Sequence, residues 1–162
     1  MNHESLMVMT AHLPMKIIPR GDGGIYLERY FLHKDSEGKE HWLHRFLSAD
    51  SDERPHSHPF KAKSTILCGW YAEEVTTRSG SIMERHMTNG NINVIHPETV
   101  HRIAAVKPNT WTYFIVERCR DSWSFIDKDG NEQLETASSP DWHLHHKTRA
   151  ETYKELGIKQ WN

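Results

Sequence analysis

The stretch Pro55-His56-Ser57-His58-Pro59 decides how the rest of this sequence is interpreted. It follows a polar loop over residues 50–55 and precedes a long β-rich segment. In an extended strand successive side chains point to opposite faces, so His56 and His58 point the same way, roughly 7 Å apart along the backbone. Two imidazoles at that spacing can bind one metal ion if a neighbouring strand supplies a third ligand.

His101, in the segment Val100-His101-Arg102-Ile103, is the residue that we expect to supply the third ligand. The chain has 13 histidines, most of which we assign to the surface or to positions between strands. The run Trp142-His143-Leu144-His145-His146 looks like a second metal cluster, but it is short and lies beyond the last predicted strand. We interpret it as an adventitious metal binder or a cover for a strand edge.

Length and composition predict one cytoplasmic domain. A chain of 162 residues can bury a core of its own. Its net charge of -2 offers no basic field for nucleic acid. It has no apolar run near the ~20 residues of a membrane helix, and residues 1–19 lack the apolar core of a signal peptide. Two cysteines make no disulfide framework, which favours a reducing compartment.

Turn signals divide the chain into short β-prone segments. Strands are predicted over residues 25–33, 41–47, 63–75, 81–87, 92–95, 100–106, 111–117 and 122–126. The first of these has apolar residues at both parities, which indicates a strand covered on both faces. Gly69 inside the third suits a bulge or a bend. Only residues 148–156 look helical, with Gly157 as the stop.

Eight or more short strands with turns between them predict an all-β sandwich or barrel. We divide the chain into an N-terminal arm (1–20), a β-barrel (21–140) and a C-terminal helical tail (141–162). Pro14 and Pro19 argue against a long helix in the arm, for which we expect one short strand.

The histidine pair lies in a segment that resembles the first motif of the cupin superfamily, a small jelly-roll barrel. That motif has the form G-x5-H-x-H-x3/4-E-x6-G. Here His56 and His58 fill the histidine slots and Gly69 the closing glycine. Ala62 occupies the glutamate slot, and Asp50 occupies the opening glycine slot.

The second cupin motif, G-x5-P-x-G-x2-H-x3-N, matches at Gly90 and His101, with its proline displaced by one position to Pro97. Its second glycine is replaced by Glu98 and its asparagine by Ala105. The likeness covers about residues 40–106 with motif support. Uncharacterised small cupins of bacteria and their phages are similar over the segment from His41 to Phe60. This resemblance implies a single cupin jelly-roll barrel.

Cupins commonly bind their metal with three histidines and a glutamate, so the resemblance implies a site on His56, His58 and His101 without the glutamate. Among cupins that set resembles the thiol dioxygenases, in which ferrous iron binds a thiolate and dioxygen side by side. Their cysteine–tyrosine pair has no clear counterpart, because Cys68 lies ten residues after His58. We favour Fe2+, with Zn2+, Ni2+ or Mn2+ as alternatives, since spacing does not select the metal.

Two residues on the strand before the motif are candidate catalytic residues. His44 is a candidate acid/base or a fourth histidine of the pocket, and Arg45 is a candidate to hold a substrate carboxylate with its planar guanidinium fork. As neighbours on one strand they face opposite ways, so only one of them points into the barrel. Arg85 is a second candidate for the carboxylate.

The leading hypothesis is a metal-dependent cupin enzyme. Its favoured form is an oxygenase that acts on a small thiol or carboxylate-bearing molecule. One alternative is a non-catalytic module that binds a metal or a metabolite in the same pocket. Another is a metal-free or zinc isomerase of the epimerase type, which needs a histidine–acid dyad for which the sequence shows no obvious acid. By analogy with other cupins we expect a homodimer, formed through strands or by exchange of the arm.

Overall fold

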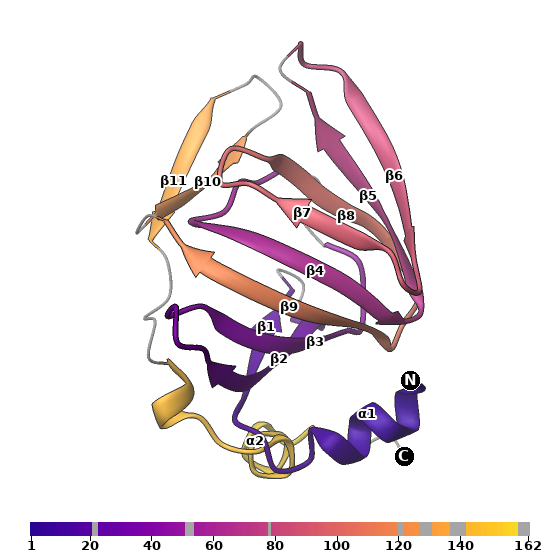
Figure 1. The fold of residues 1–162 in the computed structure, drawn as a ribbon, viewed down its shortest axis with the longest axis vertical. Helices are drawn as coiled ribbons and strands as arrows, with labels where there is room; N and C mark the ends of the chain where they lie inside the picture. Colours follow the sequence, from indigo (N-terminus) through magenta and orange to yellow (C-terminus); the bar gives the residue numbers. More distant parts are fainter. Residues whose placement is uncertain are drawn as a thin grey trace.

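Short antiparallel strands form most of this chain (Figure 1). The computed structural model describes residues 1–20, 23–50, 54–77, 79–119, 122–126, 131–136 and 142–158. Its strands are β1 (Met15–Pro19), β2 (Ile25–Lys34), β3 (Glu40–Phe46), β4 (Phe60–Cys68), β5 (Trp70–Thr76), β6 (Ile82–Thr88), β7 (Ile92–Ile95), β8 (Val100–Val106), β9 (Thr110–Arg118), β10 (Ser122–Ile126) and β11 (Glu132–Thr136). Its helices are α1 (His3–Met9), the 3-10 helix η1 (Trp142–His145) and α2 (Arg149–Leu156). The predicted strands are present, but the one predicted over residues 63–75 is divided at Gly69 into β4 and β5, and β11 is an additional strand.

The strands form two facing sheets. In the larger sheet β1, β2, β3, β9, β4 and β7 pair in that order, and in the smaller one β6, β5 and β8 do. A separate pair, β10 and β11, is joined to His56 through a β-bridge from Phe125. Side chains of both facing sheets line one internal cavity. The predicted all-β fold is confirmed, and its arrangement is that of a jelly roll.

Both α-helices lie near β1, β2 and β3, against the outer face of the larger sheet (Figure 1). Leu6 of α1 and Tyr153 of α2 pack in one buried cluster with Leu43 and Trp111. The interior of the barrel holds two further apolar clusters. Every residue of β3 is therefore buried, because the strand has the cavity on one face and the helices on the other.

The C-terminal helix begins and ends where the sequence indicates. Thr148 is its N-cap, and a capping box joins Thr148 to Glu151. Gly157 follows the helix with a left-handed φ of 66°, a conformation that glycine adopts at low cost. None of the helices that the structure describes is long and apolar enough to cross a membrane.

Residues 1–20 contain the expected short strand, β1, and also a helix that the sequence did not predict. The Asn2 side chain caps α1 by accepting a hydrogen bond from the Ser5 N–H at 2.9 Å. Leu6 is fully buried. The apolar residues 6–9 are consecutive and not spaced at helical intervals, so periodicity does not reveal α1.

Gly69 separates β4 from β5 and lets the chain pass close to Thr110. Its φ is +89°, and a Cβ at this position would lie 2.9 Å from the Thr110 Cα. The Trp70 N–H next to it donates to the Thr110 hydroxyl at 3.1 Å. Glycine is therefore required here both for its backbone conformation and for its lack of a side chain.

We expect Gly69→Ala to lower the free energy of unfolding by about 2–4 kcal/mol, because it combines a strained φ with a steric overlap. Gly38→Ala is the matched control, since Gly38 has a φ of +81° but a Cβ added there would meet nothing within 4 Å. That variant is expected to lose only about 1 kcal/mol. Urea denaturation followed by circular dichroism measures both, and equal losses would contradict the packing role of Gly69.

Candidate metal centre

His56 and His58 lie in an extended connection that leads into β4. The backbone N–H and C=O of His56 pair with those of His101 at 2.9 and 3.0 Å. Between the two histidines, the Ser57 N–H donates to the Ser124 carbonyl at 2.8 Å, and the Ser57 side chain is buried. Side chains in this segment alternate between two faces, as in a strand. Ser57 therefore points one way, and the imidazoles of His56 and His58 both point toward His101.

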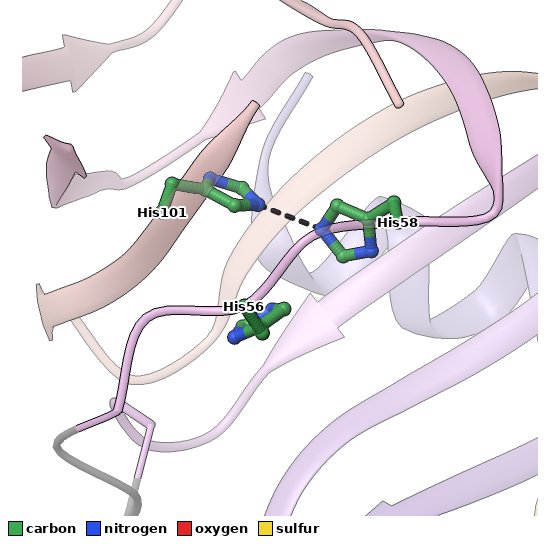
Figure 2. Close-up of side chains that lie close together, drawn as sticks. All are labelled: His56, His58 and His101. Atoms are coloured by element: carbon green, nitrogen blue, oxygen red, sulfur yellow. Dashed lines mark hydrogen bonds between the residues drawn. The ribbon is translucent and has the colours of Figure 1, made fainter. Parts of the chain in front are cut away.

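The three imidazoles converge, as Figure 2 shows. Nε2 of His58 lies 2.7 Å from Nε2 of His101. One ring nitrogen from each of the three histidines lies within 4.8 Å of the other two, and no other such group occurs among the residues that the structure describes. Neighbouring ligands of one ion at usual Zn–N distances are about 3 Å apart, so these nitrogens are close to a binding arrangement.

Glu73 of β5 fixes the orientation of His101. Its carboxylate is fully buried and pairs with Nδ1 of His101, which leaves Nε2 to face the other histidines. Arg85 donates to the same carboxylate at 2.6 Å, and Asn93 donates to it at 3.1 Å. A carboxylate on the second ring nitrogen is the usual companion of a metal-binding histidine, because it selects the tautomer with a free Nε2 lone pair.

The charges around the cluster suit an ion with neutral ligands. Burial lowers the pKa of His58 well below its usual value, with further contributions from His101 and His56. Burial acts to raise the pKa of Glu73, but its hydrogen bond and charge interaction with His101, together with Arg85, leave that pKa below its ordinary value. His58 is therefore neutral and Glu73 ionised at neutral pH, as metal binding requires.

This donor set fits a divalent transition metal. Three imidazole ligands suit iron, nickel, copper and zinc, and the set includes no carboxylate ligand that would favour Mg2+ or Ca2+. Ala62, at the position of the missing cupin glutamate, is buried in β4 and packs in the apolar cluster with Trp42 and Phe114. The carboxylate nearest to the cluster is that of Glu73 on β5, which pairs with His101 and is not one of the three ligands.

The histidines open onto the internal cavity, which has a volume of about 680 Å³. Its walls carry many apolar side chains, and His44 is one of the polar residues among them. The His44 ring stacks on Phe114 with centroids 4.5 Å apart. Burial, reinforced by the charge of Arg29, lowers its pKa well below the usual value. The structure thus places His44 in the cavity, on the inner face of β3.

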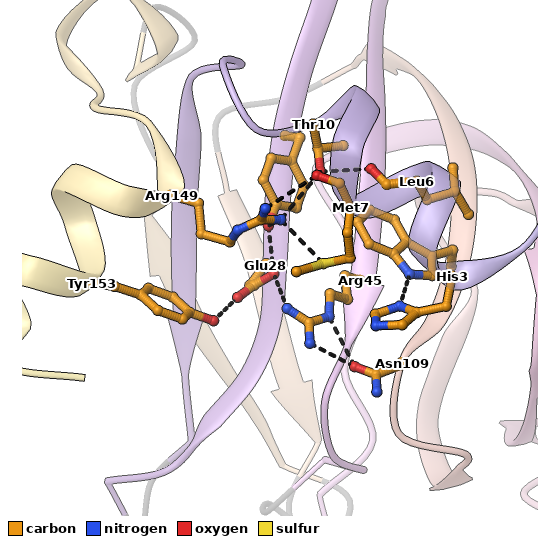
Figure 3. A network of polar contacts seen from close by, with 11 residues as sticks. His3, Leu6, Met7, Thr10, Glu28, Arg45, Asn109, Arg149 and Tyr153 are labelled. Atoms are coloured by element: carbon orange, nitrogen blue, oxygen red, sulfur yellow. Dashed lines mark hydrogen bonds and ion pairs between the residues drawn. The ribbon is translucent and has the colours of Figure 1, made fainter. Parts of the chain in front are cut away.

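Arg45 is not part of this cavity, which corrects the expectation that it holds a substrate there. It points from β3 to the outer face, where it donates to Glu28 at 3.1 Å and to Asn109 at 2.9 and 2.7 Å. Tyr153 of α2 and Tyr30 also donate to Glu28 (Figure 3). Arg45 therefore belongs to a buried network beneath the helices.

The other residues considered from the sequence also lie outside the cavity. Arg85 pairs with Glu73 and does not line the cavity wall. Cys68 packs against the outer cluster around Trp111, so it is no counterpart of the cysteine of thiol dioxygenases. Both cysteines are free thiols. In the C-terminal histidine run, His143 stacks on Phe31 at 3.8 Å, whereas the side chain of His145 falls outside the described residues.

Glu73 and Arg29 are the two residues of this region that sequence reasoning missed. Glu73 stands beside Glu74 in a strand that is otherwise rich in apolar and aromatic residues, and a buried acid at that position was the available signal. Arg29 alternates with Leu27 and Phe31 along its strand, so the sequence places a cation on an otherwise apolar face, and that was the available signal.

No protein-family profile and no curated protein sequence matches this chain. Solved structures do resemble it. The iron(II) form of HppE with the alternative substrate (S)-1-HPP superposes with a TM-score of 0.51 at 15% identity, over 68% of this chain and 57% of that chain. KdgF from Halomonas sp. gives a TM-score of 0.50 at 16% identity, over 66% and 89% of the two chains.

CapF, a capsular polysaccharide assembling protein of Staphylococcus aureus, gives a TM-score of 0.52 at 13% identity, over 78% of this chain and 32% of that chain. The matched region is thus little more than half of HppE and a third of CapF. The structural neighbours are cupin-fold proteins, so the resemblance found in the sequence is confirmed at the level of the fold. This chain has the cupin fold, with a three-histidine cluster inside it.

Glu73→Gln is expected to weaken metal binding by about 10–100-fold, because the neutral amide orients His101 less strongly and lowers its basicity. Glu74→Gln is the matched control, since Glu74 pairs with Arg102 at 2.7 Å and not with His101. Competition with a chromophoric chelator measures both affinities. Identical values for the two variants would show that Glu73 does not support the metal site.

Proposed function

We propose that this chain is a metal-dependent enzyme that acts on a small molecule inside the barrel, with iron(II) as its metal and an oxygenation as its reaction. The observation that carries the proposal is the convergence of three imidazole nitrogens, one of them held by a buried carboxylate, on a largely apolar internal cavity. Three protein ligands leave coordination positions open. The iron(II) forms of the HppE neighbours are consistent with this choice of metal.

His56, His58 and His101 would hold the metal, and iron bound there would supply a Lewis acid and electrons for dioxygen. Glu73 keeps the Nδ1 proton of His101 in place, which holds Nε2 available throughout the reaction. The aromatic walls around Phe46 and Phe114 would limit the access of bulk water to a bound substrate. His44 faces the substrate as a neutral imidazole, which has one nitrogen to donate a proton and one to accept.

Oxygen uptake tests this proposal directly. Protein purified anaerobically without a metal-affinity column is loaded with iron(II) and offered a panel of small thiols and carboxylic acids. We expect substrate-dependent oxygen consumption that chelation abolishes and that His56→Ala lacks. Full iron loading with no uptake for any member of the panel would count against an oxygenase and in favour of a binding module.

The His101–Glu73 pair also favours a second function, an isomerase of the epimerase type. The sequence showed no acid for a histidine–acid dyad, but the structure pairs these two buried residues. In this alternative His101 removes a substrate proton and Glu73 stabilises the imidazolium. Proton exchange from sugar-like substrates into deuterated water that survives chelation and is lost in Glu73→Gln would support it.

We further propose that the enzyme acts in the cytoplasm as a homodimer and binds neither nucleic acid nor a membrane. The free cysteines and the net charge of -2 support this setting. Sedimentation equilibrium tests the oligomeric state, for which a mass of twice 19.0 kDa is expected.

A further inference from the structure

Arg29 is a half-buried cation that faces the same cavity as the three histidines. Its guanidinium lies over the Trp42 ring, 4.4 Å from the centroid. Among the residues that the structure describes it makes no hydrogen bond or ion pair, and its Nε is buried without a partner. Burial lowers the pKa of Arg29 to about 10, so it still carries its charge at neutral pH. A cation partly removed from bulk water is normally paired in proteins, so this guanidinium favours an anion in the cavity.

His44 provides a second polar group at the same point. Arg29 and His44 stand directly opposite each other on β2 and β3. His44 is only 3% exposed, and its Nε2 has no hydrogen-bond partner among the described residues. An unpaired buried donor or acceptor costs roughly 1–3 kcal/mol, which a ligand that pairs with it removes.

Among the described residues no acid of the cavity wall forms a hydrogen bond or ion pair with Arg29, although the charge of Glu40 acts to raise the pKa of Arg29. Glu40 pairs with Lys34 at 3.4 Å, and Asp50 accepts the Ile103 N–H at 2.8 Å. Arg29, His44 and the three histidines of the cluster all line this one cavity. An anion placed against Arg29 is therefore within the same cavity as the proposed metal.

We propose that the cavity binds a small organic acid whose carboxylate lies against Arg29 and His44 while its other end reaches His56, His58 and His101. This assignment rests on the proposed metal-dependent function and names its substrate class. A guanidinium fork binds a carboxylate through two parallel hydrogen bonds, and the His44 Nε2–H donates a third. His44 is then a substrate-binding residue of the cavity.

The test uses the full chain loaded with cobalt(II), whose sulfur-to-cobalt absorption reports thiolate binding at the metal. The probes are mercaptoacetate, 3-mercaptopropionate and 4-mercaptobutyrate, each compared with the mercaptoalcohol of equal length. We expect the acid that spans the two subsites to bind at least about tenfold more tightly than its alcohol. Arg29→Gln is expected to remove this preference without weakening the alcohol, and Arg29→Lys to retain part of it.

Arg102→Gln is the control, because it removes the same charge from an arginine that pairs with Glu74 and does not line the cavity. It should keep the full preference for the acid. Equal affinity for acids and alcohols in the wild type, or a preference that survives Arg29→Gln, would overturn the proposal. If Arg29→Gln does not fold, His44→Gln and Arg29→Lys provide the same comparison, with a reduced preference expected in each.

Failure of the metal site gives a different result from failure of the anion subsite. If cobalt(II) does not bind, the proposed function is wrong, and the subsite is then tested on metal-free protein. Saturation-transfer NMR compares propionate with 1-propanol there. Binding of propionate alone, lost in Arg29→Gln, supports the anion subsite, and equal signals for both probes reject it.

Discussion

Replacing His101 by alanine is expected to reduce the metal content of the purified protein from about one equivalent to nearly none. The imidazole of His101 supplies the Nε2 that lies 2.7 Å from Nε2 of His58. Its loss leaves two ligands and also removes the partner of Glu73, which becomes a buried and less compensated carboxylate. Mass spectrometry of metals on protein prepared without an affinity column measures the effect.

His96→Ala is the control for this substitution, since His96 is an exposed histidine that follows β7. Its metal content should equal that of the wild type. His56→Ala should reproduce the loss seen with His101→Ala, because both residues belong to one cluster. Wild-type protein that contains no metal even after reconstitution would refute the site and leave the isomerase as the better function.

Replacing Arg45 by methionine is expected to lower the free energy of unfolding by about 3–5 kcal/mol, because Glu28 then remains buried without its cation. Glu28 is fully buried, and the Arg45 side chain is 9% exposed. Burial, together with the charge of Glu28, raises the pKa of both Tyr30 and Tyr153, so both phenols stay protonated and donate to this carboxylate. Neutral donors alone do not compensate the charge.

Urea denaturation measures this loss, with Arg102→Met as the matched control. Arg102 and Glu74 are both partly exposed, at 23% and 25%, so breaking their pair should cost less than about 1 kcal/mol. Metal content should stay at the wild-type level in Arg45→Met, because Arg45 faces away from the cavity. A folded Arg45→Met protein of unchanged stability would contradict the structural role of this network.

The network also shows how the two α-helices are held against the larger sheet. Arg149 of α2 donates to the Tyr30 hydroxyl at 3.2 Å and to the Met7 carbonyl at 3.1 Å (Figure 3). Trp111 of β9 donates from its indole nitrogen to His3 of α1 at 3.0 Å. These contacts join both helices to the outer face of the larger sheet around Glu28.

Local signals in the sequence were sufficient for most of the strands and for the three histidines that form the cluster. Turn residues and β-prone segments located the strands, and capping residues located α2, because such preferences act over a few neighbouring residues. The spacing of His56 and His58 set their common face through the alternation of an extended chain. His101 followed from its place in the cupin motifs, and the structure brings all three together.

Only the tertiary structure decided which face of each strand is the interior. The parity of β3 separates His44 from Arg45, but helices cover one face of that strand and the cavity lies on the other, so both residues are buried. Burial alone therefore could not assign them. The pairing of Glu73 with His101 depends on β5 lying beside β8. Contacts between strands distant in sequence arise from packing of the whole barrel, which no local pattern encodes.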